Sequence, residues 1–223
     1  MSEKTTRASH TRQRTLLRRI WYQMWRLFFK IPVDLLARPA CRGRRNIPAT
    51  GAVLVVSNHQ SYLDPPVIGT RISRCMNYLA KQELFESKIF GGYLRSVDTI
   101  PLDQHGLGFQ GIKETLKRLR SGEMVLIFPE GKRSLDGELT SFRHGYVNVA
   151  VKTGATILPT AIDGAWAMYR PGQKFPNFFK PRVRVEFGEP ITPADYQNMT
   201  ENELHALVEQ RVTELFERNR VKK

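Results

Sequence analysis

Short apolar runs alternate with amphipathic helical segments from residue 46 onward, and this alternation most constrains the fold. Residues 52–57 (AVLVVS) and 124–129 (MVLIFP) are typical of strands buried on both faces. Continuous apolar runs of about four to eight residues leave no strand face for solvent. Strands that alternate with helices predict an α/β fold, here a layered domain with a partly parallel sheet flanked by helices.

Further elements follow the same periodicity. Strands are expected at residues 76–80, 99–102, 156–162 and 182–188, and helices at residues 65–72, 89–97, 109–120 and 146–153. Asp64 is the expected N-cap of the helix at 65–72, with Pro65 in its first turn. Thr200 and Glu203 form a capping box that opens a last helix towards Arg218. Residues 46–223 are therefore expected to form one domain after a basic segment, residues 1–45.

Positive charge is concentrated in that first segment. The chain carries a net charge of +14, and residues 1–45 hold 12 of its 35 basic residues and two acidic ones. Such a field attracts phosphates of lipid, metabolite or nucleic acid. No run reaches the roughly 18 apolar residues of a transmembrane helix. The two cysteines, Cys41 and Cys75, lack metal-ligand spacing, which favours a reducing compartment.

Residues 16–31 (LLRRIWYQMWRLFFKI) form the one strongly aromatic amphipathic pattern. On a helical wheel, a polar face with four cations lies opposite a wide face of Trp, Phe, Leu and Ile, and Pro32 is expected to end the helix. This composition favours a helix that lies in the interface of an anionic membrane. The alternative is a helix that packs its apolar face on its own domain.

Two candidate site residues follow the first strand, in NHQSYLD. His59 and Asp64 form a pair that suits general-base catalysis, since a carboxylate fixes the imidazole tautomer and stabilises the imidazolium. The chain has no G-x-S-x-G motif and no cysteine in a catalytic context. The pair therefore fits a reaction in which a substrate hydroxyl attacks. The alternative is a loop histidine followed by a helix-capping aspartate.

A second candidate site follows the strand at 124–129, in FPEGKRS. A glycine turn at Gly131 followed by Lys132 and Arg133 suits an anion, because backbone N–H groups and a guanidinium can bind phosphate together. Glu130 is expected to pair with these cations and brace the loop. Lys81, at the end of the strand at 76–80, is a further candidate. An ordinary basic turn and a solvated lysine are the alternatives.

Together these stretches resemble the glycerolipid acyltransferase family, and within it the 1-acylglycerol-3-phosphate (lysophosphatidate) acyltransferases. The resemblance covers about residues 47–190 in matching order. NHQSYLD matches the block in which four residues separate histidine from aspartate, and FPEGKRS matches the glycine–arginine block. KQELF and ILPTAI match weaker flanking blocks. The family implies a layered acyltransferase domain, here residues 46–223.

The resemblance implies direct transfer of a fatty acyl group from a coenzyme A or acyl-carrier-protein thioester to the free hydroxyl of a lysophospholipid. With 1-acylglycerol-3-phosphate as acceptor the product is phosphatidic acid. No metal, other cofactor or covalent intermediate is implied. His59 becomes the general base, Asp64 its orienting residue, and Arg133 with Lys81 the binder of the acceptor phosphate. The enzyme is expected to lie peripherally on the cytoplasmic face of a membrane.

One position departs from the family pattern. In TIPLDQ, Gln104 stands where the family usually has arginine, and an amide cannot replace bidentate phosphate recognition. Lys132 would compensate in part. The acceptor's head group therefore stays open, and another lysolipid, such as a lyso-ornithine lipid, is the alternative acceptor.

The sequence gives less support to two other classes of protein. A sequence pI near 10.1 suits a nucleic-acid-binding protein, but the aromatic residues interleaved with arginine lie on an amphipathic helix and not on a strand platform. We therefore expect no nucleic-acid partner. A metal hydrolase is not supported, because the five histidines form no i,i+4 pair that would begin a three-ligand site.

Overall fold

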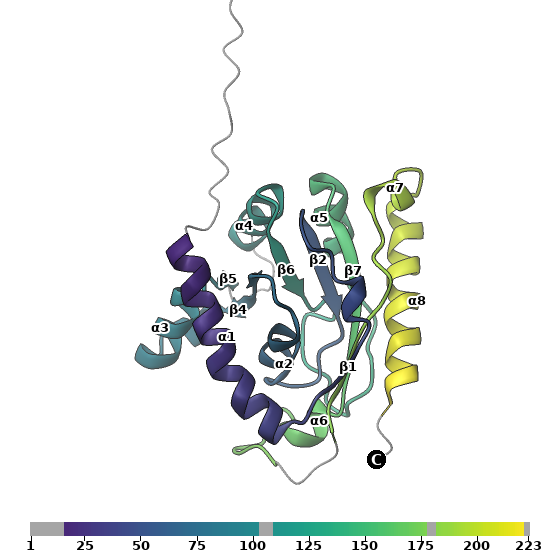
Figure 1. The fold of residues 1–223 in the computed structure, drawn as a ribbon. Coiled ribbons are helices and arrows are strands. Elements are labelled where there is room, and N and C mark those ends of the chain that lie inside the picture. The colour runs from purple at the N-terminus through teal and green to yellow at the C-terminus, as the bar shows by residue number, and fades with distance from the viewer. Residues whose placement is uncertain (1–15, 103–108, 178–181, 221–223) are drawn as a thin grey trace, which may run out of the picture.

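A computed structural model describes residues 16–102, 109–177 and 182–220 of the chain. In this part of the chain a six-stranded main sheet has the order β1-β8-β7-β2-β6-β3 (Figure 1). Its strands are β1 (Ala40–Arg42), β2 (Val53–Ser57), β3 (Met76–Asn77), β6 (Met124–Ile127), β7 (Thr156–Asp163) and β8 (Arg184–Phe187). All neighbours are parallel except β7 and β8, which confirms the partly parallel sheet.

The central strands have their carboxyl termini at the same end of the sheet. β2 pairs with β6 and with β7, so that Val55 lies between Leu126 and Leu158. The carboxyl ends of these parallel strands therefore lie together at one end of the sheet. This end is near α6 (Ala165–Met168), the helix that follows β7 and lies at the bottom of Figure 1. Both predicted site loops begin here, after β2 and after β6.

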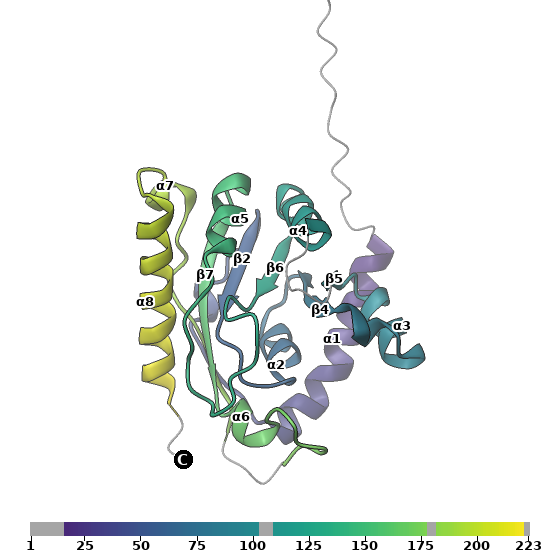
Figure 2. The ribbon, with the colours of Figure 1, turned by 180° about the vertical axis from the view of Figure 1, so that it is seen from behind.

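Helices cover both faces of the main sheet. In Figure 2, α4 (Phe109–Arg120), α5 (Gly145–Thr153) and α8 (Glu201–Asn219) lie on one side, and α1 (Leu16–Leu36) and α2 (Asp64–Arg71) lie behind. Val53 and Val55 of β2 belong to the core under α1 and α2. Leu54 and Val56 belong to the core under α4, α5 and α8. Alternate residues of one strand thus fill both cores, which explains its unbroken apolar run.

A smaller sheet of β4 (Leu79–Lys81) and β5 (Ile100–Leu102) lies beside α3 (Lys88–Ser96). The strand expected at 76–80 is therefore two strands in different sheets, β3 and β4, with Tyr78 between them. The remaining elements are η1 (Arg44–Asn46), η2 (Gln82–Phe85) and α7 (Pro193–Tyr196). The capping box of Thr200 and Glu203 at the start of α8 is confirmed.

The prediction that Pro32 ends the first helix is wrong, because α1 continues to Leu36. A proline inside a helix removes a backbone hydrogen bond and costs about 3 kcal/mol. Tertiary contacts of the next turn offset this cost. Val33 is buried in the core, and Asp34 forms ion pairs with Lys30 and with Arg71 of α2.

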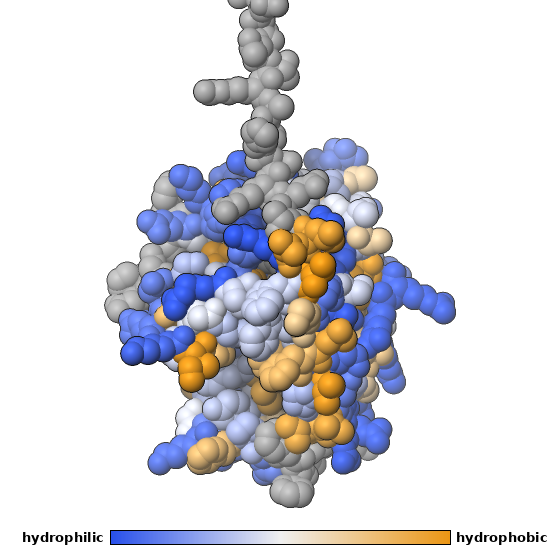
Figure 3. Space-filling view, turned by 60° about the vertical axis from the view of Figure 1, so that its left-hand side comes forward, coloured by the Kyte–Doolittle hydropathy of each residue, from blue (hydrophilic) through white to orange (hydrophobic). Residues whose placement is uncertain are grey.

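The polar face of α1 faces the domain. Tyr22 is buried, its hydroxyl lies 3.1 Å from that of Tyr78, and Gln23 Nε2 donates to the backbone oxygen of Ser73 at 2.7 Å. The opposite face exposes ten large apolar side chains, and Figure 3 shows apolar residues gathered on this side of the molecule. They are Leu16, Leu17, Ile20, Trp21, Met24, Leu27, Phe28, Ile31, Leu35 and Leu36.

Part of the aromatic face does pack on the domain. The rings of Trp25 and Phe29 lie 5.0 Å and 5.1 Å from that of Tyr93 on α3. Residues 1–45 also contribute β1, which pairs with β8. Within the described ranges, no helix is long and apolar enough to span a bilayer.

Candidate active site

Asp64 binds the ring of His59 at the carboxyl end of β2. His59 Nδ1 lies 2.7 Å from Asp64 Oδ2, and Asp64 is fully buried. The same oxygen accepts the backbone N–H groups of Gln60 at 2.6 Å and Ser61 at 2.8 Å. The three hydrogen bonds at one oxygen fix the orientation of the Asp64 carboxylate. A neutral imidazole that donates from Nδ1 keeps Nε2 as its acceptor.

Asp64 is not the cap of α2, contrary to the prediction. Leu63 stands at the N-cap position and makes no side-chain capping bond, while Asp64 is the first helical residue. Its carboxylate turns back towards the preceding loop because the N–H groups of Gln60 and Ser61 lie there. The alternative of a helix-capping aspartate with an unrelated histidine therefore does not describe this loop.

The loop after β6 holds the backbone of His59. The imidazole stacks on Phe128 with ring centroids 3.9 Å apart. The backbone N–H of His59 donates to Glu130 Oε1 at 2.7 Å, and its carbonyl accepts the N–H of Ser134 at 2.8 Å. Since 18% of the His59 side chain stays exposed, the ring is fixed in place and still open to a substrate.

Glu130 braces His59, and the prediction that it pairs with the cations of its own loop is wrong. While Oε1 accepts the His59 N–H, Oε2 accepts the backbone N–H of Thr140 at 3.1 Å and its hydroxyl. The residue is buried. Burial raises the pKa of Glu130, and the hydrogen bonds from Thr140 and His59 oppose that shift. With both oxygens bound, Glu130 connects the two site loops.

The turn that carries Arg133 has the geometry expected of a glycine turn. Gly131 has φ +71°, and its N–H donates to Phe128 O at 3.0 Å. A side chain at this φ is strained in any L-residue. Lys132 is exposed. The guanidinium of Arg133 lies 3.4 Å from the ring centroid of Tyr62, and its Nη1 is buried without a hydrogen-bond partner among the described residues. Arg133 thus has a donor for a ligand.

One further predicted residue is not brought to this loop. Lys81 is exposed at the carboxyl end of β4, in the smaller sheet. Gln104 lies outside the described residues. His144 stacks on His205 of α8 with ring centroids 3.7 Å apart. Within the described ranges, no group of three His, Cys, Asp or Glu could hold a metal ion.

Several residues that hold the site were not singled out from the sequence. Asn58 connects the loop after β2 to β7. Its side chain donates a hydrogen bond to Ile162 O and accepts one from the N–H of Ile162, both at 2.9 Å. Gln60 Nε2 donates to Gly137 O at 2.6 Å and to Asp163 Oδ1 at 2.8 Å. The signal in the sequence was the two amide side chains of Asn58 and Gln60, which flank His59 directly after a buried strand and could have been predicted to hold the loop.

A histidine that hydrogen-bonds a buried carboxylate lies beside an arginine turn at the carboxyl ends of parallel strands. In an α/β fold this arrangement is suited to general-base catalysis of group transfer onto a hydroxyl. A model of the acyltransferase family matches residues 38–163. The chain is 31% identical over 191 residues to a 1-acyl-sn-glycerol-3-phosphate acyltransferase of Bacillus subtilis, covering 83% of this chain and 92% of that one. The chain belongs to the acyltransferase family.

Two further relatives were found. A chloroplastic 1-acyl-sn-glycerol-3-phosphate acyltransferase, LPAT1, of Arabidopsis thaliana is 31% identical over 66% of this chain and 40% of its own length. The crystal structure of the 1-acyl-sn-glycerophosphate acyltransferase PlsC from Thermotoga maritima matches with a TM-score of 0.78. That match has 28% identity and covers 95% of this chain and 86% of that one. The predicted fold and the predicted family are confirmed.

Proposed function

We propose that this protein is a 1-acylglycerol-3-phosphate acyltransferase, which acylates the free hydroxyl of lysophosphatidate to give phosphatidic acid. The activities named for the relatives support this assignment. One observation on this chain carries it: a histidine base bound at 2.7 Å to a buried carboxylate, in contact with a loop whose arginine keeps a buried donor free of partners among the described residues.

The proposed step uses His59 as the base. Nε2 accepts the proton of the acceptor hydroxyl as its oxygen attacks the thioester carbonyl carbon, forming a tetrahedral intermediate. The C–S bond then breaks, and the imidazolium returns its proton to the leaving thiolate. Atoms and charge balance without an enzyme-bound acyl group. Asp64 holds the Nδ1–H tautomer throughout and stabilises the imidazolium.

Arg133 is the proposed binder of the acceptor phosphate. A guanidinium offers paired N–H donors that match two phosphate oxygens. Tyr62 covers one face of this guanidinium, and the phosphate would bind at its edge. Lys132, exposed one residue earlier, is the proposed additional cation.

The thioester donor is proposed to be acyl-CoA or an acyl-carrier protein. Both present the acyl group on a phosphopantetheine arm, and both leave as a thiol after the step described above. The reaction as written needs no metal or other cofactor.

We further propose that the exposed apolar face of α1 lies in the cytoplasmic interface of an anionic membrane. A helix whose Trp, Phe and Leu side chains are exposed while its polar side packs on the protein is suited to bury that face at the acyl boundary of a bilayer. Ile89 and Phe90 of α3 are also exposed and extend this surface, which would bring a lipid acceptor to the enzyme.

Thiol release and product mass test the proposal together. Purified protein is incubated in detergent micelles with acyl-CoA and one acceptor per reaction. The acceptors compared are lysophosphatidate, lysophosphatidylcholine, glycerol 3-phosphate and a lyso-ornithine lipid. We expect phosphatidic acid from lysophosphatidate and little release with the others, and His59→Ala should remove it. Preferred acylation of another acceptor would overturn the assignment of the acceptor but not that of the base.

A further inference from the structure

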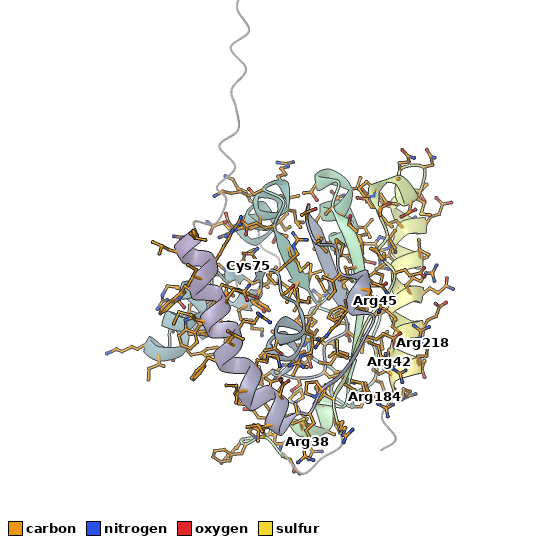
Figure 4. The ribbon with its side chains drawn as sticks, viewed as in Figure 1. Arg38, Arg42, Arg45, Cys75, Arg184 and Arg218 are labelled. Carbon is orange, nitrogen blue, oxygen red and sulfur yellow. The ribbon has the colours of Figure 1, made fainter. Side chains whose placement is uncertain are left out.

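Five arginines gather along the edge of the main sheet that is formed by β1 and β8. They are called the edge arginines below and are labelled in Figure 4: Arg38, Arg42, Arg45, Arg184 and Arg218. They come from the segment after α1, from β1, η1 and β8, and from the last turn of α8. None of them belongs to the site around His59, and the proposed reaction uses none of them.

Most of this positive charge is not neutralised. Arg38, Arg42 and Arg45 are exposed, and their side chains form no hydrogen bond or ion pair with any residue in the described ranges. Arg218 pairs with Glu186 at 2.8 Å, with 60% of its side chain still exposed. Arg184 Nη1 donates to the carbonyls of residues 219 and 220 at the end of α8, and these carbonyls carry no formal charge.

The edge arginines differ in character from the surface proposed for the membrane. All exposed large apolar side chains found in the described ranges lie outside residues 37–51 and 182–190, and none is in the last turn of α8. A surface helix that enters a bilayer needs such anchors. In Figures 1 and 2, α8 lies on the other side of the molecule from α3 and from the start of α1, and of the edge arginines only Arg38 lies close to α1, at its C-terminal end. A polar, cationic surface there suits a soluble acidic partner.

This edge is also close to the reacting groups. Arg184 stands opposite Asp163 of β7 in the sheet register, and Asp163 accepts a hydrogen bond from Gln60, the neighbour of His59. With strands about 4.8 Å apart, β8 lies two spacings, about 10 Å, from β2, and β1 lies about 14 Å away. A phosphopantetheine arm anchored near the edge arginines would therefore reach the base.

We propose that the edge arginines dock an acidic acyl-carrier protein that delivers the acyl thioester to His59. The proposal rests on the proposed function and names its donor. The arginines extend over four elements instead of converging on a pocket, which fits the broad face of a protein better than the compact phosphates of a nucleotide. Complementary charge across such a surface speeds encounter and selects the partner.

The test compares donors with charge-reversed variants of the full chain. In Arg42→Glu/Arg45→Glu two exposed cations of the docking surface change sign. The matched control, Arg120→Glu/Lys152→Glu, reverses two exposed cations of α4 and α5. Rates are measured with acyl-carrier protein and with acyl-CoA, on lysophosphatidate in micelles at low salt. We expect kcat/KM for the carrier-protein donor to fall about tenfold or more in the first variant only, with acyl-CoA use within about twofold of wild type.

Each result has one meaning. Added salt should lower the rate of wild type with the carrier-protein donor towards that of Arg42→Glu/Arg45→Glu, because salt screens the charges of exposed arginines. An equal loss with both donors, an equal loss in the control, or a loss of vesicle binding in place of donor use overturns the docking proposal. Wild-type transfer from acyl-CoA but not from the carrier protein overturns it as well. If wild type transfers from neither donor, the proposed function itself fails.

Discussion

Replacing Asp64 tests how its carboxylate serves His59, and the structure separates two variants. All three donors, from His59, Gln60 and Ser61, bind Oδ2, while Oδ1 is buried without a partner among the described residues. In Asp64→Asn the amide oxygen can take the place of Oδ2 and keep all three hydrogen bonds. Only the charge is lost. In Asp64→Ala the hydrogen bonds are lost with it.

The magnitudes follow from these contacts. General-base catalysis supplies about 10²–10⁴-fold in total, so Asp64→Ala, which leaves the ring free to turn, should approach the loss seen in His59→Ala. Asp64→Asn keeps the ring in place but does not stabilise the imidazolium, and about a 10²-fold loss of kcat is expected. In Asp64→Ala two buried N–H groups also lose their acceptor, at about 1–3 kcal/mol each. Its melting temperature should therefore fall by about 4 °C or more.

The assay follows thiol release at saturating acyl-CoA with lysophosphatidate in micelles, with thermal melts of the same preparations. We expect kcat in the order wild type, Asp64→Asn, Asp64→Ala, and a smaller melting shift for Asp64→Asn than for Asp64→Ala. If Asp64→Asn were less active than Asp64→Ala, its amide would be turned with the NH₂ towards His59, and the argument from the three donors would be wrong. Asp64→Ala activity within tenfold of wild type would refute the orienting role.

Three further predictions concern other parts of the chain. Arg133→Ala should raise KM for lysophosphatidate by about tenfold or more and leave KM for the thioester donor nearly unchanged; equal changes for both substrates would count against phosphate binding. Trp21→Ser/Phe28→Ser, which changes two exposed side chains, should weaken binding to anionic vesicles with little effect on the melting temperature, and normal vesicle binding would exclude α1 as the anchor. Burial, with the charge of His144, lowers the pKa of His205 below its usual 6.5, so the unfolded chain takes up a proton that the folded chain does not as pH falls below about 6.5. The melting temperature of wild type should therefore drop more between pH 7.5 and 5.5 than that of His205→Gln, and parallel pH profiles would contradict this.

Local sequence was enough for elements whose boundaries depend on neighbours along the chain. The helix at 109–120 has the predicted bounds, and the capping box of Thr200 and Glu203 is present. The strand predicted at 52–57 differs from β2 by one residue. In these segments periodicity and capping depend on residues only a few positions apart, so the sequence pattern is enough to predict where each element begins and ends.

Predictions failed where a distant contact changed the local preference. A proline favours the end of a helix, but Val33 and Asp34 find partners in the core and on α2, and α1 continues. A first-turn aspartate favours a cap, but the N–H groups of Gln60 and Ser61 bind Asp64 instead. The apolar run at 76–80 was read as one strand, and its two halves pair with different neighbours.

The sequence by itself determined that strands alternate with helices, and that His59 and Arg133 each follow a buried strand. Parallel pairing of these strands then required the two loops to lie at the same end of the sheet, where the strands have their carboxyl termini. Only the tertiary structure decided which groups meet there. Glu130 holds the backbone of a histidine 71 residues away, and α1 turns its polar side inward because Tyr78 and Ser73 offer it partners. Such contacts depend on how packed elements are oriented in space, and periodicity along the chain carries no information about that orientation.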